Sequence, residues 1–148
     1  MTGFRFPLKR VLDWRRTQLE LEEARYKQQT AELAALDRAR AEMEAAGIRA
    51  EVQVREWNPV AGRDLAALGA FRRKVKSREA EIALRRVECA RRLDEQQKVM
   101  LEARRRYRLL EKLEERRLTE WREARDRELD DLATESYLAK WARGKMTK

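Results

Sequence analysis

The chain has 148 residues, of which 43% are charged, and it carries a formal net charge of +9. Soluble globular domains average about 25% charged residues, so this composition excludes a compact domain with a deep core. The chain has no histidine and a single cysteine, which excludes histidine-based acid–base catalysis, an internal disulfide and a cysteine zinc site. We therefore expect no enzyme activity, no bound metal and no cofactor.

Ala, Leu, Glu, Lys and Arg supply 95 of the 148 residues, a composition typical of coiled coils and long helices. We predict an all-α fold: a long antiparallel two-helix coiled-coil hairpin with a longer C-terminal helix, forming a single domain over residues 1–148. No run of about 20 apolar residues and no signal-peptide apolar region occurs, so we expect a cytoplasmic protein.

The first helix is predicted over about residues 8–56, with Pro7 at its start, where a missing N–H costs little. The turn is predicted at residues 57–63, because Asn-Pro followed by Gly62 is the strongest turn signal in the chain. Asp64 is expected to cap the second helix, predicted over about residues 65–143. Gly47 and Gly69 fall inside these helices as weak points.

Apolar residues recur at heptad spacing in both predicted helices, which indicates a seam between them. A short turn makes the helices antiparallel, with residue i facing about residue 121 minus i. Glu22, Gln29 and Gln96 interrupt the seam and are expected to fix its register. The apolar rows are Leu8, Leu12, Leu19, Tyr26, Leu33, Leu36, Met43, Ala50, Val54 and Trp57 in the first helix, and Leu65, Leu68, Val75, Ile82, Cys89, Leu93, Met100, Ala103, Tyr107, Leu110 and Trp121 in the second.

The second helix is predicted to outrun the first by about 30 residues. This overhang needs a cover for its apolar stripe, and its two tryptophans favour docking to another protein over a frayed tail or a dimer contact. The stripe comprises Leu118, Trp121, Leu129, Leu132, Leu138 and Trp141. Phe71 lies off both heptad rows and is predicted to be an exposed contact residue, whereas Cys89 lies on a row and is predicted to be a buried structural thiol.

Positive charge is concentrated in the second part of the chain, since residues 58–148 carry a net charge of +8 and residues 1–57 a net charge of +1. The densest cluster is the run 104–108, in which four arginines surround one tyrosine. Such runs are usually solvated helix faces with glutamates three or four residues away. Because no DNA-binding motif occurs, we expect no nucleic-acid partner.

The opening Phe4-Arg5-Phe6-Pro7-Leu8, continuing to Arg15, resembles the N-terminus of the FliJ family, the coiled-coil component of the flagellar export apparatus. The run 110–117, followed by Glu120-Trp121-Arg122, is similar to that family's C-terminal pattern. The family's Glu-Gln-Lys-Glu-Leu-Asp-Glu run would fall on residues 125–131, where the Glu-Gln pair is missing.

This resemblance implies a non-catalytic stalk and chaperone component of flagellar type III protein export, similar to the stalk proteins of virulence secretion systems and to the rotary ATPase gamma-subunit coiled coil. It implies that the terminal segments enter the pore of a hexameric export ATPase and that the turn region contacts the cytoplasmic domain of an export gate protein. It also implies binding of export chaperones and a location at the cytoplasmic face of the membrane, reached through partners only.

The residues that the resemblance assigns to the gate contact are Phe71, Val75 and Ile82. To the ATPase pore we assign Phe4, Phe6, Trp14, Arg104, Arg105, Arg108, Trp121 and Trp141, since a basic surface suits an acidic pore lining. Two alternatives stay open: a structural or scaffolding coiled coil, as a monomer or a dimer, and, with less support, a basic helical nucleic-acid-binding protein. The oligomeric state is also open, because the same seam could pair two chains.

Overall fold

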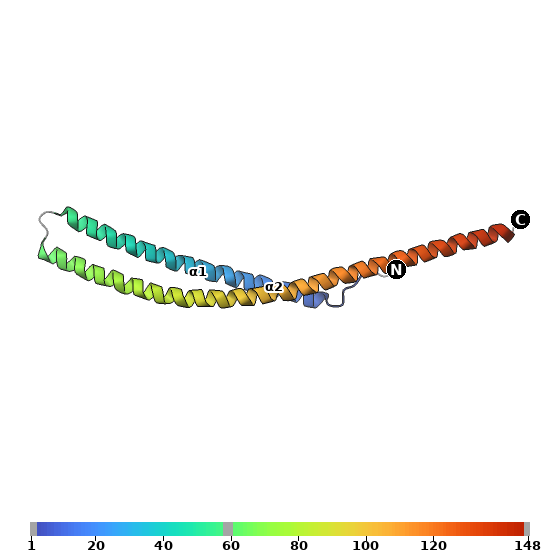
Figure 1. Cartoon of the computed structure of the whole chain (residues 1–148), viewed down its shortest axis with the longest axis horizontal. Helices are drawn as coiled ribbons and strands as arrows, with labels where there is room; N and C mark the ends of the chain where they lie inside the picture. Colours follow the sequence, from blue (N-terminus) through green and yellow to red (C-terminus); the bar gives the residue numbers. More distant parts are fainter. Residues whose placement is uncertain (1–2, 58–60, 147–148) are drawn as a thin grey trace. The chain divides into compact units, whose positions relative to one another are not determined.

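The computed structural model describes residues 3–57 and 61–146, and these residues form two long helices. Helix α1 spans Lys9–Glu56 and helix α2 spans Gly62–Met146 (Figure 1). No strand occurs in these two ranges, so the prediction of an all-α fold is confirmed. The predicted turn signal at residues 58–60 lies outside the described residues.

Helix α1 begins after a turn at Pro7 and Leu8, one residue later than predicted, and its first hydrogen bonds run from Lys9 N to the Phe6 carbonyl (3.1 Å) and from Leu12 N to the Leu8 carbonyl (2.9 Å). Helix α2 begins three residues earlier than predicted. The Ala61 carbonyl accepts hydrogen bonds from Asp64 N (3.0 Å) and Leu65 N (3.2 Å). Asp64 therefore lies within the first turn rather than at the cap, where its negative charge still favours the positive end of the helix dipole.

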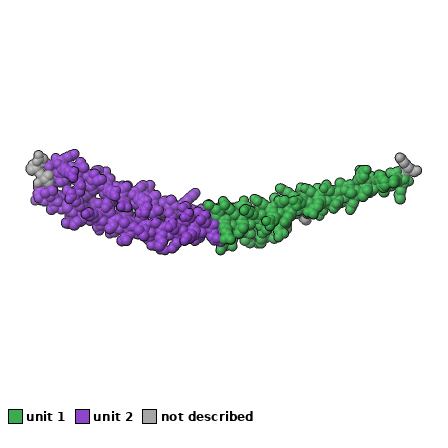
Figure 2. All heavy atoms as spheres, viewed as in Figure 1, with its two compact units in different colours: residues 1–18, 103–148 green, residues 19–102 purple. Residues whose placement is uncertain are grey.

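The described chain forms two compact units, shown in Figure 2: unit 1 comprises residues 1–18 and 103–148, and unit 2 comprises residues 19–102. The single-domain assignment stays a prediction. In unit 2, side chains of α1 and α2 meet at Arg86 Nε–Asp37 Oδ1 (2.6 Å) and Arg72 Nε–Glu51 Oε1 (2.7 Å). In unit 1, Lys9 Nζ lies 3.6 Å from Glu114 Oε2, and Arg16 Nε lies 3.3 Å from the Tyr107 hydroxyl. Within each unit the partner's number falls as the α1 residue number rises.

Packing between the helices follows the predicted heptad rows. Leu12 is 2% exposed, and Val75 and Met100 are each 8% exposed. Most other row positions are half-buried, because each helix is covered along one stripe and open to solvent elsewhere. Three row residues near the helix ends are instead exposed: Leu8, Trp57 and Leu65. The rows therefore match the burial along the interface, and the exceptions lie beside the start of α1 or at the turn end of the two helices.

A polar layer interrupts this apolar interface in unit 2. Glu22 is 8% exposed, and its carboxylate accepts hydrogen bonds from the Gln96 amide and from Arg25 Nη1 (3.0 Å), while Gln96 Nε2 also donates to the Glu22 carbonyl (3.2 Å). Seven residues further along α1, two helical turns away, the buried Gln29 Oε1 accepts no hydrogen bond from the described residues. Since these bonds form only when Glu22 and Gln96 are aligned, the layer restricts the register of the two helices.

The same substitution at two positions of this layer should have opposite effects on stability. Gln96→Leu removes the amide that donates a hydrogen bond to the buried Glu22 carboxylate. We expect it to lower the free energy of unfolding by about 1–3 kcal/mol. Gln29→Leu removes a buried oxygen that lacks a donor, and we expect a gain of about 1 kcal/mol. Urea unfolding followed by circular dichroism measures both. A loss of equal size in the two variants would contradict the assigned hydrogen bonds.

Two helical glycines offer a second test of the packing. A Cβ at Gly47 would lie 3.8 Å from Val75 Cγ1, an ordinary contact distance, and a Cβ at Gly69 would meet no heavy atom within 4 Å. Gly47→Ala and Gly69→Ala should each raise the free energy of unfolding by about 0.5–1 kcal/mol, because alanine loses less backbone entropy in a helix. Gly3→Ala, outside the helices, is the control and should leave the unfolding midpoint unchanged.

Candidate docking surfaces

The C-terminal part of α2 has an uncovered surface within unit 1. Every side chain from Asp126 to Met146 is exposed, including Leu132 (58%) and Trp141 (53%). We call residues 126–146 the exposed tail. Lys145 Nζ lies 3.9 Å from the centroid of the Trp141 ring, a cation–π contact with a ring that is still about half exposed. The predicted overhang thus begins after Arg125, later than the sequence indicates.

An aromatic cluster at the start of the chain covers the preceding part of α2. The Phe4 and Trp121 rings lie 6.1 Å apart, tilted by 56°, and Phe4, Phe6 and Trp121 are all half-buried. Arg125 Cζ lies 5.1 Å from the Trp121 ring centroid. Residues 4–8 and four residues of α2 line a shallow pocket there: Leu113, Arg117, Glu120 and Trp121. These aromatic residues therefore pack within unit 1, and Trp121 differs from Trp141 in its surroundings.

The other residues assigned to the ATPase pore lie in unit 1. Trp14 is 53% exposed, with Arg15 Cζ 4.7 Å from its ring centroid. Arg105 and Arg108 are exposed, and Arg104 is half-buried. Arg104 and Arg105 each interact with another residue, as expected for charged residues on a helix with acidic neighbours. Part of the basic run is therefore engaged in contacts within the protein.

The three residues assigned to the export gate lie on α2 in unit 2, and their burial corrects one prediction. Phe71 is half-buried rather than exposed. Its position follows Leu68 by three residues, which places it at the border of the stripe that faces α1. Val75 belongs to the core at 8% exposure, and Ile82 is half-buried. Only part of the Phe71 ring is accessible to a partner.

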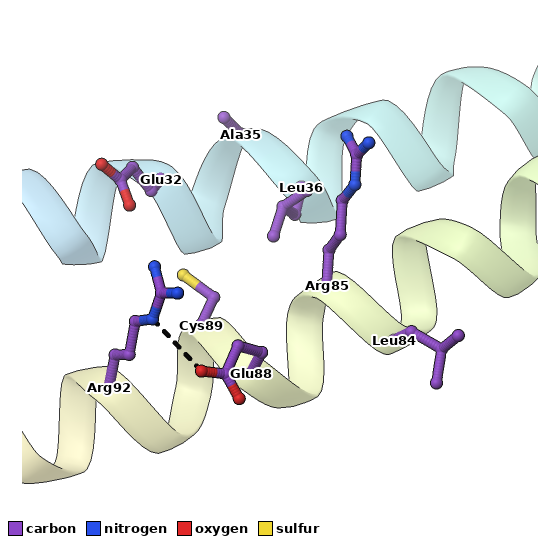
Figure 3. Close-up of a pocket in the computed structure, with 8 residues that line it drawn as sticks. All are labelled: Glu32, Ala35, Leu36, Leu84, Arg85, Glu88, Cys89 and Arg92. Atoms are coloured by element: carbon purple, nitrogen blue, oxygen red, sulfur yellow. Dashed lines mark hydrogen bonds and ion pairs between the residues drawn. The ribbon is translucent and has the colours of Figure 1, made fainter.

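An open groove between the helices of unit 2 lies beside Cys89 (Figure 3). The Cys89 thiol is half-buried and points toward α1, where it lies 3.9 Å from the Gln29 carbonyl. It is therefore a packing residue on the interface, half-buried where the sequence predicts full burial. The lining residues are Glu32, Ala35 and Leu36 of α1 and Leu84, Arg85, Glu88, Cys89 and Arg92 of α2.

Ion pairs on α2 border this groove. Arg91 Nη2 lies 2.6 Å from Glu88 Oε1, and this hydrogen bond lowers the pKa of the Glu88 carboxyl below its ordinary value. The same hydrogen bond raises the pKa of the Arg91 guanidinium. A hydrogen bond to Asp37 likewise raises the pKa of Arg86. All these side chains are exposed, so each pair contributes little to stability, and none forms a nucleophile–base arrangement.

Within residues 3–57 and 61–146, no cluster of three or more potential ligands is placed to hold a metal ion. In the same ranges no helix combines the length and apolar character needed to cross a membrane. The absence of enzyme activity and of a cofactor stays a prediction. The surfaces that this structure offers to other molecules are stretches of exposed helix.

Comparison with the models of known protein families, with curated proteins and with solved structures finds no significant match to this chain.

The two tryptophans of α2 should respond differently to truncation. Trp121→Ala removes a half-buried ring that packs on Phe4, and we expect the free energy of unfolding to fall by about 2 kcal/mol. Trp141→Ala removes an exposed ring and should change this free energy by less than about 0.5 kcal/mol. Thermal unfolding followed by circular dichroism distinguishes the two, and equal losses would contradict the different burial of the two rings.

Proposed function

We propose that this chain is a non-catalytic stalk and chaperone component of a flagellar type III protein export apparatus, which couples the export ATPase hexamer to the membrane export gate. In this proposal the two helices form one antiparallel coiled-coil hairpin. The side-chain pairs support that arrangement: Asp37 contacts Arg86 where the sequence register expects about residue 84, and Glu22 contacts Gln96 where it expects about residue 99.

The observation that carries the proposal is the exposed tail. Helix α2 has 85 residues and α1 has 48, and the surplus ends in a segment whose leucines and Trp141 are all exposed. Isolated helices gain little stability from propensity alone, so a long uncovered helix with an aromatic residue suits a partner that covers it. The terminal sequences that resemble the FliJ family indicate the export ATPase as that partner.

The remaining assignments follow from the same resemblance. Among the aromatic residues of the proposed pore contact, Trp14 and Trp141 have the most accessible rings. Phe4, Phe6 and Trp121 are half-buried and would contribute by packing within unit 1. The gate contact would use the accessible part of Phe71. The proposal also includes chaperone binding and a position at the cytoplasmic face of the membrane. Neither of these is assigned to particular residues.

The test uses the purified export ATPase of the same organism. We expect the chain to be a monomer by light scattering, to elute with the nucleotide-bound ATPase hexamer and to raise its turnover. The paired variant Leu132→Ala, Trp141→Ala should abolish the increase in turnover, because it removes the exposed apolar groups of the tail.

The matched control is Leu84→Ala, Val87→Ala, which removes two residues of unit 2 that are 75% and 70% exposed. This control should stimulate turnover like the unmodified chain. A stable dimer that neither binds the ATPase nor changes its turnover would overturn the proposal and leave a scaffolding coiled coil.

A further inference from the structure

A local excess of basic residues lies in unit 2, in the stretch that includes the end of α1 and the start of α2. Residues 49–78 contain eight basic and three acidic residues, a net charge of +5, which leaves +4 for the other 118 residues. All eight basic side chains are exposed. Arg72 is neutralised by Glu51 at 2.7 Å. The basic residues are Arg49, Arg55, Arg63, Arg72, Arg73, Lys74, Lys76 and Arg78.

Exposed apolar side chains occur in and just before the same stretch of sequence. Ile48 and Val52 are four residues apart on α1 and are 64% and 49% exposed, so they share one face of that helix. Trp57 follows the last residue of α1 and is 43% exposed, and Leu65 in the first turn of α2 is 57% exposed. We define the turn-end surface by these four residues together with Arg55 and Arg63.

We propose that the turn-end surface binds an anionic lipid bilayer directly. Tryptophan with one apolar side and one polar N–H favours the interface between lipid headgroups and acyl chains. Arginines beside it would contact lipid phosphates, and each cation near an anionic bilayer strengthens binding about fivefold. This contact goes beyond the proposed function, in which the protein reaches the membrane only through the export gate.

The mixed chemistry of the surface favours a bilayer over nucleic acid. A duplex would engage the cations through its phosphates but would leave Ile48, Val52 and Leu65 in water. A bilayer accepts both groups, because apolar side chains enter the headgroup boundary while cations stay at the phosphates.

The experiment measures sedimentation of the full-length chain with vesicles of phosphatidylcholine mixed with phosphatidylglycerol, and with vesicles of phosphatidylcholine alone. We expect binding to the anionic vesicles that weakens with salt, and little binding to the neutral ones. Arg55→Gln, Arg63→Gln should weaken binding about 25-fold, by two cations at about fivefold each. Trp57→Ala, Leu65→Ala should weaken it at every salt concentration, since apolar contacts are not screened.

The matched control is Arg38→Gln, Arg122→Gln, which makes the same change in net charge at exposed positions outside the turn-end surface. This control should bind like the unmodified chain. Equal weakening in the control would overturn the proposal by showing a general effect of net charge. Equal binding to both vesicle types, or tighter binding to duplex DNA that is unaffected by Trp57→Ala, Leu65→Ala, would also overturn it.

The turn-end variants separate this proposal from the proposed function. All substituted side chains are exposed, so circular dichroism should show unchanged helix content. Stimulation of the export ATPase depends on the exposed tail and should persist in both turn-end variants. Loss of stimulation in the tail variant with normal vesicle binding supports both proposals, whereas failure of the unmodified chain to bind anionic vesicles overturns the bilayer contact alone. Phe71→Ala should leave vesicle binding intact.

Discussion

The fold depends on the mutual burial of one apolar stripe on each helix. This interface is a single layer thick: Leu12, Val75 and Met100 are the apolar residues at or below 8% exposure among the described residues. Ion pairs such as Arg86–Asp37 cross the border of the interface but are exposed and weak. Because each helix is stabilised mainly by the stripe of the other, any helical surface that lacks a facing stripe is open to a partner.

Most of the fold could be predicted from heptad spacing, composition and the two prolines. Helix α1 ends at the predicted Glu56, and the half-buried positions follow the predicted rows. The start of α2 was misplaced because a side-chain cap at Asp64 is visible in a sequence, whereas the backbone carbonyl of Ala61 that accepts the first hydrogen bonds is not. Local signals identify a helix end to within a turn, and the backbone decides the rest.

The candidate sites were harder to predict. Heptad spacing shows which face of a helix a residue lies on, but it does not show whether another segment of the chain packs against that face at that point. Trp121 and Trp141 both belong to the apolar stripe predicted for the overhang, yet the non-helical residues 4–8 cover Trp121 alone. Phe71 was expected to be exposed because it lies off the rows, but a large ring at the border of a stripe still reaches the interface. The turn-end surface could not be predicted from the sequence, because Trp57 and Leu65 belong to the apolar rows and would be expected to be buried. Only their exposure in the structure shows that the rows end there.

The exposed tail has a consequence for how its affinity is set. Without a facing stripe, its helix is supported only by backbone hydrogen bonds and the propensities of its own residues, so local opening costs little free energy. A partner that binds it as a helix must also supply the free energy of keeping it ordered. Helix propensity then influences affinity separately from the contacts: replacing Thr134 or Ser136 with alanine, a stronger helix former than either, would favour the ordered state before any contact forms. The binding strength of this segment is therefore set partly by how readily its own sequence forms a helix.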